Sequence, residues 1–273
     1  MNKPAMILID VDGTLVDSVP DLAFCVDAMM NRLGMPERGE KRVRHWVGNG
    51  VERLVKRALV NQLDGEPDEA LYARALPVFE ALYRDNTSKR SCLYPGVQEA
   101  LDFLQTTGVR IGCVTNKAAQ FTEPLLKDLG VADEFAIIIS GDTLPQKKPH
   151  PAPLLHAAEF FGIAPEASLM IGDSVSDVKA ARAAGFQIVC MSYGYNHGED
   201  IRDANPDAVI DTMTEILPLL EKAGLSKVIN GPIPYTPDGN PLIGPMPGVP
   251  NAFEACVFTF GIAQAGGAGK VLA

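Results

Sequence analysis

The chain has 273 residues, of which 47% are hydrophobic and 21% are charged, and its formal net charge at pH 7 is −10. This composition is typical of a globular protein with a sizeable core, in one large domain or two modest ones. The acidic balance disfavours nucleic acid as a partner, because no basic stripe is available to neutralise phosphates. It is still compatible with a small anionic substrate, since a site can be locally positive in an acidic protein.

The cysteines are scattered along the chain and include no Cys-x-x-Cys pair. They are Cys25, Cys92, Cys113, Cys190 and Cys256. This arrangement argues against a disulfide framework or a zinc site and fits a reducing compartment. No apolar run approaches the length of a membrane span, and the first residues do not have the pattern of a signal peptide. We therefore expect a cytoplasmic protein without a membrane partner.

The first predicted element is a strand over residues 5–9, because this run is continuously apolar and short. Two carboxylates, Asp10 and Asp12, follow it, and Gly13 allows the backbone to turn sharply. The next block is helical throughout. Helices are predicted over 20–33, 51–59 and 67–89, the last kinked or divided at Pro77, with a turn-bearing stretch over 42–50. No strand is expected between residues 19 and 91, so this block is an insertion after the first strand.

From residue 91 onward, predicted helices and strands alternate. Helices are predicted over 97–104, 121–129, 151–161, 177–184 and 213–222. Strands are predicted over 109–114, 136–139, 169–171, 187–191 and 208–210. This alternation is typical of a parallel sheet covered by helices on both faces. Polar residues follow the strands, so we expect them to gather along the sheet edge where open α/β sheets bind ligands.

The polar residues that follow these strands have the chemistry of a phosphoryl-transfer site. They are Asp10, Asp12, Thr115, Asn116, Lys148, Asp173 and Asp177. Neighbouring carboxylates repel each other and lose hydration, so they are tolerated when a cation lies between them or when one is protonated. Carboxylate and phosphate oxygens are ligands for Mg²⁺, and lysine, hydroxyl and amide groups can hold the remaining phosphoryl oxygens. One carboxylate can form an aspartyl-phosphate, and a second can act as acid and then base.

These residues lie in segments that resemble, in order, the four motifs of the haloacid dehalogenase superfamily. The segments are Asp10-Val11-Asp12-Gly13-Thr14, Val114-Thr115-Asn116, Lys148-Pro149 and Gly172-Asp173-Ser174-Val175-Ser176-Asp177. The resemblance covers residues 1–222 and implies a Rossmann-like parallel α/β core with an inserted α-helical C1 cap. It predicts a core over 1–18 and 91–222, a cap over 19–90 and a C-terminal extension over 223–273.

The resemblance also implies roles for the carboxylates. Asp10 would be the nucleophile and a Mg²⁺ ligand. Asp12 would be the general acid and base, and its backbone carbonyl would also bind the metal. Asp173 would be the third protein ligand. The chain departs from the family at Ile9, where phenylalanine is usual, and isoleucine should pack equivalently.

The remaining motif residues would bind the phosphoryl group or support its site. The resemblance implies that Thr115 and Lys148 contact the phosphoryl group, helped by Asn116. Asp177 would hold either a metal-bound water or Lys148. Taken singly, these residues have ordinary structural explanations, such as a helix cap for Thr115 or a helix-start charge for Asp177. The functional interpretation is favoured because all of them follow successive strands.

Further segments resemble the phosphoglycolate phosphatases within this superfamily. They are Trp46-Val47-Gly48-Asn49-Gly50, Tyr94-Pro95-Gly96 and Lys148-Pro149-His150-Pro151. The predicted function is therefore Mg²⁺-dependent hydrolysis of a small phosphomonoester, 2-phosphoglycolate, to glycolate and phosphate. Asn49 and Arg53 are candidates to contact the substrate carboxylate, the alternative being a solvated helix face. We expect a monomer or a homodimer.

Other functions are compatible with the same core. A β-phosphoglucomutase-like sugar phosphomutase, or a phosphatase for another small metabolite, would differ in the cap. A 2-haloacid dehalogenase is disfavoured because it needs no Mg²⁺ site. The chain could also be a non-catalytic sensor of a phosphorylated ligand or a scaffold, but the retention of every motif residue argues against this.

The end of the chain differs in composition. Residues 230–273 contain 7 Pro and 8 Gly, and their charged residues are Asp238, Glu254 and Lys270. The stretch 235–244 and the glycines near the end resemble the end of the FAD domain of dimethylglycine and sarcosine dehydrogenase-type oxidoreductases. The chain has no Gly-x-Gly-x-x-Gly after a strand, and Val271 follows Lys270 where a P-loop needs Ser or Thr. We therefore interpret the extension as an orphan fragment that binds no flavin.

Overall fold

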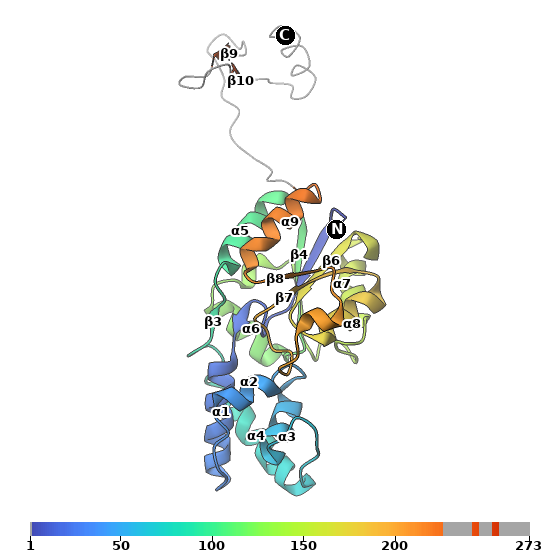
Figure 1. The fold of residues 1–273 in the computed structure, drawn as a ribbon. Helices are drawn as coiled ribbons and strands as arrows, with labels where there is room; N and C mark the ends of the chain where they lie inside the picture. Colours follow the sequence, from blue (N-terminus) through green and yellow to red (C-terminus); the bar gives the residue numbers. More distant parts are fainter. Residues whose placement is uncertain (1, 226–241, 246–252, 257–273) are drawn as a thin grey trace. The chain divides into compact units, whose positions relative to one another are not determined.

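The computed structural model describes residues 2–225, 242–245 and 253–256 (Figure 1). Contacts divide the chain into two units, Met1–Lys227 and Val228–Ala273. Within the described part of the second unit, β9 (Leu242–Pro245) and β10 (Phe253–Cys256) pair in antiparallel fashion. The other residues that carry the flavoprotein resemblance lie outside the described residues.

A six-stranded parallel sheet forms the centre of the first unit (Figure 1). Its strand order is β5-β4-β1-β6-β7-β8. Its strands are β1 (Met6–Ile9), β4 (Arg110–Val114), β5 (Ile137–Ile139), β6 (Ser168–Gly172), β7 (Gln187–Met191) and β8 (Ala208–Ile210). These strands confirm the six predicted from the sequence, and they confirm the predicted α/β class. Because β1 lies between β4 and β6, the residues that follow these three strands are neighbours at one sheet edge.

Helices cover both faces of this sheet (Figure 1). One face carries α5 (Val97–Thr107), α6 (Ala119–Asp128) and α9 (Ile216–Lys222), and the other carries α7 (Ala152–Phe161) and α8 (Val175–Ala184). Short 3-10 helices connect these elements: η1 (Ala132–Glu134), η2 (Pro165–Ala167), η3 (Ile201–Ala204) and η4 (Met213–Glu215). The two faces follow from strand alternation, because successive side chains of a strand point to opposite sides.

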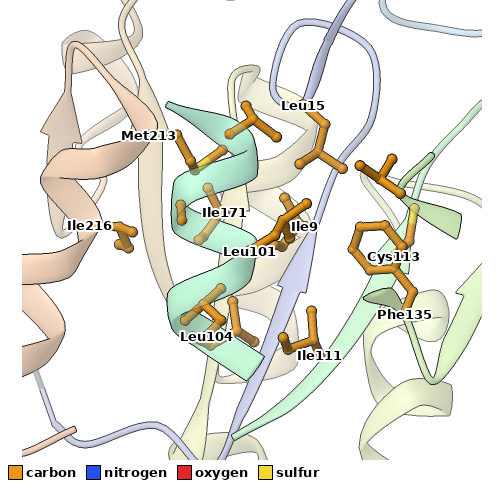
Figure 2. Close-up of a cluster of buried hydrophobic side chains, with 14 of the residues drawn as sticks. Ile9, Leu15, Leu101, Leu104, Ile111, Cys113, Phe135, Ile171, Met213 and Ile216 are labelled. Carbon is orange, nitrogen blue, oxygen red and sulfur yellow. The ribbon is translucent and has the colours of Figure 1, made fainter. Parts of the chain in front are cut away.

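Strand β1 shows this alternation directly. Ile9 packs with Leu101 and Ile216 in the cluster drawn in Figure 2, whereas Leu8 belongs to the cluster on the other face. Every side chain of β1 is buried. The central strand is thus held between two apolar layers, which fixes where its carboxyl end emerges.

Four helices lie between the short antiparallel strands β2 (Val16–Asp17) and β3 (Cys92–Leu93). They are α1 (Val19–Arg32), α2 (Glu40–Trp46), α3 (Val51–Val60) and α4 (Glu69–Arg84), and we call residues 19–84 the helical insert. The insert has its own apolar cluster, which includes Val26, Trp46 and Phe79. The prediction that no strand lies between residues 19 and 91 is confirmed within the described residues.

One local prediction is wrong, and for another the structure excludes one of two alternatives. Residues 42–50 were expected to be a turn-bearing stretch, but α2 extends into them. The buried residues of α2, Val43 and Trp46, are three positions apart, which is too little to define a helical period. The helix predicted as kinked or divided at Pro77 is not divided there: α4 continues through the proline, with Ala75 and Phe79 buried on either side of it. Packing of these side chains stabilises the helix against the hydrogen bond that proline removes.

The described helices include none that is long and apolar enough to cross a membrane.

The central core yields a prediction about stability. Leu101 is 1% exposed and packs against β1, whereas Leu155 on α7 is 40% exposed. We expect Leu101→Ala to lower the free energy of unfolding by about 2–5 kcal/mol, through lost transfer energy and a cavity. The matched change Leu155→Ala should cost less than about 1 kcal/mol. Urea unfolding of both variants measures the difference, and equal losses would contradict this account of the core.

Candidate active site

Lys148 lies between two carboxylates at the carboxyl edge of the sheet. Its Nζ is 3.0 Å from Oδ1 of Asp10 and 2.7 Å from Oδ1 of Asp177. Nζ also donates a hydrogen bond to the carbonyl oxygen of Val114, at 2.7 Å. The side chain is 2% exposed. The end of β4, the loop after β1 and the start of α8 are therefore joined by one buried ammonium group.

Asp173 and Asp177 are held by the turn from β6 into α8. Thr14 Oγ1 donates to Oδ1 of Asp173 at 2.8 Å, and the amide of Tyr195 donates to Oδ2 at 2.6 Å. Asp177 closes a capping box with Ser174 at the start of α8. Oδ2 of Asp177 accepts from the Ser174 hydroxyl at 2.7 Å, while Oδ1 faces Lys148. Asp177 thus caps a helix and binds the lysine at the same time.

Three carboxylates of this group form a potential metal site. Oxygens of Asp10, Asp173 and Asp177 lie within 4.8 Å of one another. Burial raises the pKa of Asp10 to about 7, opposed by Lys148 and reinforced by the charge of Asp177. Burial and the charges of Asp177 and Asp10 raise the pKa of Asp173 well above its usual value. These donors fit a hard divalent cation, whose charge would stabilise the ionised carboxylates against the burial and repulsion that raise both pKa values.

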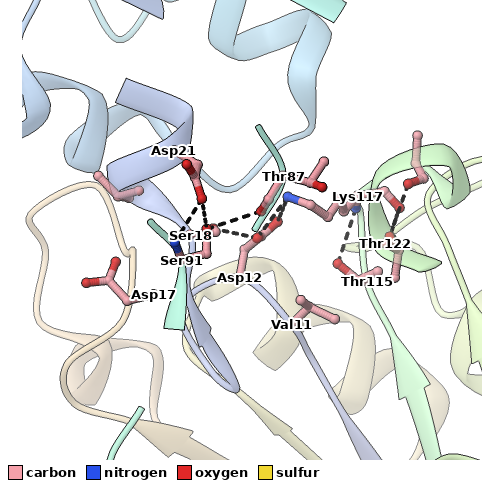
Figure 3. Close-up of polar contacts among 12 residues, drawn as sticks. Val11, Asp12, Asp17, Ser18, Asp21, Thr87, Ser91, Thr115, Lys117 and Thr122 are labelled. Carbon is pink, nitrogen blue, oxygen red and sulfur yellow. Dashed lines mark hydrogen bonds and ion pairs between the residues drawn. The ribbon is translucent and has the colours of Figure 1, made fainter. Parts of the chain in front are cut away.

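Asp12 points to a second buried lysine (Figure 3). Nζ of Lys117 is 3.0 and 3.1 Å from the two carboxylate oxygens of Asp12. The Ser18 hydroxyl donates to Oδ1 of Asp12 at 2.6 Å. Burial lowers the pKa of Lys117, but the Asp12 charge and the Tyr83 contact more than reverse this, so its pKa lies above the usual value. Lys117 Nζ also lies 4.8 Å from the centre of the Tyr83 ring, which belongs to α4 of the insert.

The phosphoryl-binding candidates of the β4 end lie at the same edge. Thr115 is buried, and its Oγ1 accepts from the amide of Lys117 at 3.2 Å (Figure 3). Asn116 Nδ2 donates to the carbonyl oxygen of Lys148 at 2.9 Å. The structure thus brings together all seven residues that the sequence placed in the phosphoryl site.

A cavity opens above these residues, between the sheet edge and the helical insert. We call it the central cavity. It is lined by Asp10, Asp12, Leu22, Val47, Gly48, Gly50, Val51, Leu54, Thr115, Asn116, Lys117, Asp173, Ser174 and Tyr195. The sheet edge contributes the carboxylate, hydroxyl and ammonium groups, while the insert contributes apolar side chains and glycines. A small polar ligand would therefore meet charged groups on one side and an apolar cover on the other.

The two candidates for substrate specificity lie elsewhere. Asn49 Oδ1 accepts from Arg57 Nη2 at 2.9 Å, and Arg53 Nη1 donates to Glu66 at 2.8 Å. Both line a separate surface pocket together with Lys147. The structure therefore does not bring Asn49 or Arg53 into the lining of the central cavity.

Sequence reasoning missed Lys117 and Tyr195, which both line the central cavity. The position of Lys117 directly after Thr115 and Asn116, at the end of a predicted strand, was an available signal. Its partner Asp12 is 105 residues away, so the ion pair itself could not be predicted. Tyr195 follows the β7 strand in the same way, but a tyrosine at a strand end is not specific for any chemistry.

Comparisons with known proteins agree with this geometry. The family described as haloacid dehalogenase-like hydrolase matches residues 7–191. A phosphoglycolate phosphatase of Nitrosococcus oceani is 71% identical over 223 residues, which are 82% of this chain and 99% of that protein. The phosphoglycolate phosphatase of Nitrosospira multiformis is 46% identical, over 80% of this chain and 96% of that protein.

Solved structures show the same fold. The crystal structure of a predicted phosphoglycolate phosphatase from Haemophilus somnus superposes with a TM-score of 0.76 at 35% identity. The match covers 80% of this chain and 99% of that protein. These similarities agree with the order of the strand-end motifs and with the buried cluster around Lys148. The chain therefore belongs to the haloacid dehalogenase-like hydrolase family, and within that family it is similar to phosphoglycolate phosphatases.

Proposed function

We propose that this chain is a Mg²⁺-dependent phosphatase that hydrolyses 2-phosphoglycolate to glycolate and phosphate. The observation that carries the proposal is the buried cluster in which Lys148 contacts Asp10 and Asp177 beneath the central cavity. High identity to relatives named phosphoglycolate phosphatase supports the same activity. In this proposal Asp10 and Asp173, with the backbone carbonyl of Asp12, hold the metal.

The charge balance of the cluster supports a divalent ion. The cluster contains four carboxylates (Asp10, Asp12, Asp173 and Asp177) and two buried lysines (Lys117 and Lys148), so two negative charges remain if all are ionised. When bound, Mg²⁺ would supply Lewis-acid stabilisation of charge on the phosphoryl oxygens. Lys148 keeps Asp10 in place, and Asp177 keeps Lys148 in place.

The chain's own residues then account for both half-reactions. A carboxylate oxygen of Asp10 attacks phosphorus, and the bond between phosphorus and the glycolate oxygen breaks while Asp12 donates a proton to that oxygen. Water then attacks the aspartyl-phosphate, Asp12 takes its proton, and phosphate leaves Asp10 as a free carboxylate. Thr115, Asn116 and Lys148 hold the phosphoryl oxygens, so that positioning and charge neutralisation lower the barrier.

Lys117 supports a substrate with a second anionic group. It lines the central cavity, is almost fully buried and lies beside Asp12. When Asp12 is protonated as the general acid, the Lys117 charge is free to attract the carboxylate of 2-phosphoglycolate. The apolar side chains of Val47, Val51 and Leu54 would exclude water around a ligand of this size.

Release of phosphate from a panel of small phosphomonoesters tests the proposal. We expect 2-phosphoglycolate to be the preferred substrate, with activity lost in EDTA and restored by Mg²⁺. Interconversion of sugar phosphates without phosphate release would instead show a phosphomutase. Binding of phosphate esters without any turnover would show a sensor.

The nucleophile assignment gives one prediction. Asp10→Asn should lower kcat by at least about a thousandfold, because an amide cannot form the acyl-phosphate intermediate. Asp142→Asn is the matched control, since Asp142 is an exposed carboxylate that contacts a backbone amide. Circular dichroism should show both variants folded. Substantial turnover by the Asp10 variant would refute the nucleophile assignment.

The position of Lys117 gives another prediction. Lys117→Met should lower kcat/KM for 2-phosphoglycolate by about a hundredfold, because Asp12 loses its partner and the cavity loses a charge. Lys127→Met is the control, since Lys127 on α6 is exposed. For ethyl phosphate, which has no carboxylate, the loss in the Lys117 variant should be about tenfold smaller. Equal losses on both substrates would show that Lys117 does not contact the carboxylate.

A further inference from the structure

The loop of residues 193–197, after β7, packs directly on the Asp173 carboxylate. The amide of Tyr195 donates to Oδ2 of Asp173 at 2.6 Å. A Cβ placed on Gly194 would lie 2.0 Å from Cβ of Asp173, so only glycine allows this approach. Movement of this loop would therefore move Asp173, or remove one of its two hydrogen bonds.

The side chain of Tyr195 extends from this loop to residues 17–19, where the helical insert leaves the core. We call residues 17–19 the joint. The Tyr195 hydroxyl donates to Oδ1 of Asp17 at 2.5 Å. The hydroxyl oxygen of Tyr195 also accepts from the backbone amides of Ser18 at 3.1 Å and Val19 at 3.4 Å. Tyr195 is 2% exposed, and a buried hydroxyl bonded to a carboxylate is a strong, oriented contact. One residue thus contacts Asp173 through its backbone and the joint through its side chain.

The insert contacts the same joint from its own side. Arg44 of α2 binds both oxygens of Asp17, at 3.1 and 3.2 Å, and its guanidinium lies 5.5 Å from the centre of the Tyr195 ring. His197 Nδ1 lies 2.8 Å from the carbonyl oxygen of His45, at the end of α2. A continuous series of contacts therefore leads from α2 through Asp17 and Tyr195 to Asp173.

We propose that Tyr195 is a positioning residue that couples the placement of the helical insert to the placement of the Asp173 carboxylate. The inference rests on the proposed function, in which Asp173 is a metal ligand. The joint also contacts the other side of the site, since Ser18 donates to Asp12 (Figure 3). The position of the insert is thereby linked to both Asp173 and Asp12. When the insert lies over the central cavity, these two carboxylates are therefore held in their positions in the site.

Four variants of the full chain test this coupling: Tyr195→Phe, Arg44→Gln, the double variant, and Tyr72→Phe as the control. The control also loses a tyrosine hydroxyl, but Tyr72 lies on α4, where its ring faces Lys56. For each variant, kcat and KM for 2-phosphoglycolate, the affinity for Mn²⁺ by calorimetry, and the melting temperature are measured. Because Arg44 is partly exposed, its variant keeps the test valid if Tyr195→Phe folds poorly.

We expect Tyr195→Phe to lower kcat about tenfold with KM changed less than about twofold, and to weaken Mn²⁺ binding several-fold. Arg44→Gln should give a smaller change in the same direction. The double variant should be no worse than Tyr195→Phe, because both residues act through Asp17. Tyr72→Phe should resemble the unaltered protein.

Three results would overturn the proposal. Tyr195→Phe could match Tyr72→Phe in every measurement, it could lower only the melting temperature, or its effects could add fully to those of Arg44→Gln. The Mn²⁺ measurement needs no substrate, so it decides the coupling even if the unaltered protein does not hydrolyse 2-phosphoglycolate. In that case the proposed function would fail and the coupling could still hold. Absence of Mn²⁺ binding to the unaltered protein would overturn the coupling, because Asp173 would then not be a ligand.

Discussion

The ion contacts of Lys148 are the constraint on which the rest of the site depends. A buried ammonium group is costly unless it is paired, and here it is paired with Asp10 and Asp177 while also bonding a backbone carbonyl. These partners come from the end of β1 and the start of α8, and Lys148 comes from the segment between β5 and α7. They meet only because β1 lies between β4 and β6 in the sheet. The strand order therefore determines both how the apolar core packs and which charged side chains meet at the sheet edge.

A second constraint is the connection between the core and the helical insert. Two chain segments cross it, and the short β2–β3 pair holds them together. Asp21, buried in α1, accepts hydrogen bonds from the amide and hydroxyl of Ser91 on the returning segment (Figure 3). Arg90 adds an ion pair to the same carboxylate. The insert thus has its own apolar core but is connected to the sheet domain by a few polar contacts. These contacts place its apolar residues over the charged sheet edge.

The fold was largely predictable because its signals are local. Continuous apolar runs marked the strands, and the alternation with amphipathic helices indicated a parallel sheet with two helical layers. Elements of two residues, such as β2 and β3, were missed because no periodicity can be read from so short a segment. Helix α2 was missed for the same reason, since Val43 and Trp46 alone do not define a helical face.

The site likewise has features that could be predicted from local sequence and features that could not. The sequence by itself determined which residues stand at the strand ends, and so which carboxylates, hydroxyl and lysine could share one sheet edge. Only the tertiary structure decided that Lys117 pairs with Asp12, that Arg53 turns to Glu66 instead of the cavity, and that Tyr195 joins Asp173 to Asp17. The physical reason is that residue type and strand position are local properties. A charge or hydrogen-bond partner is instead decided by how distant segments pack together, as with Asp17 and Tyr195, which lie 178 residues apart in the chain.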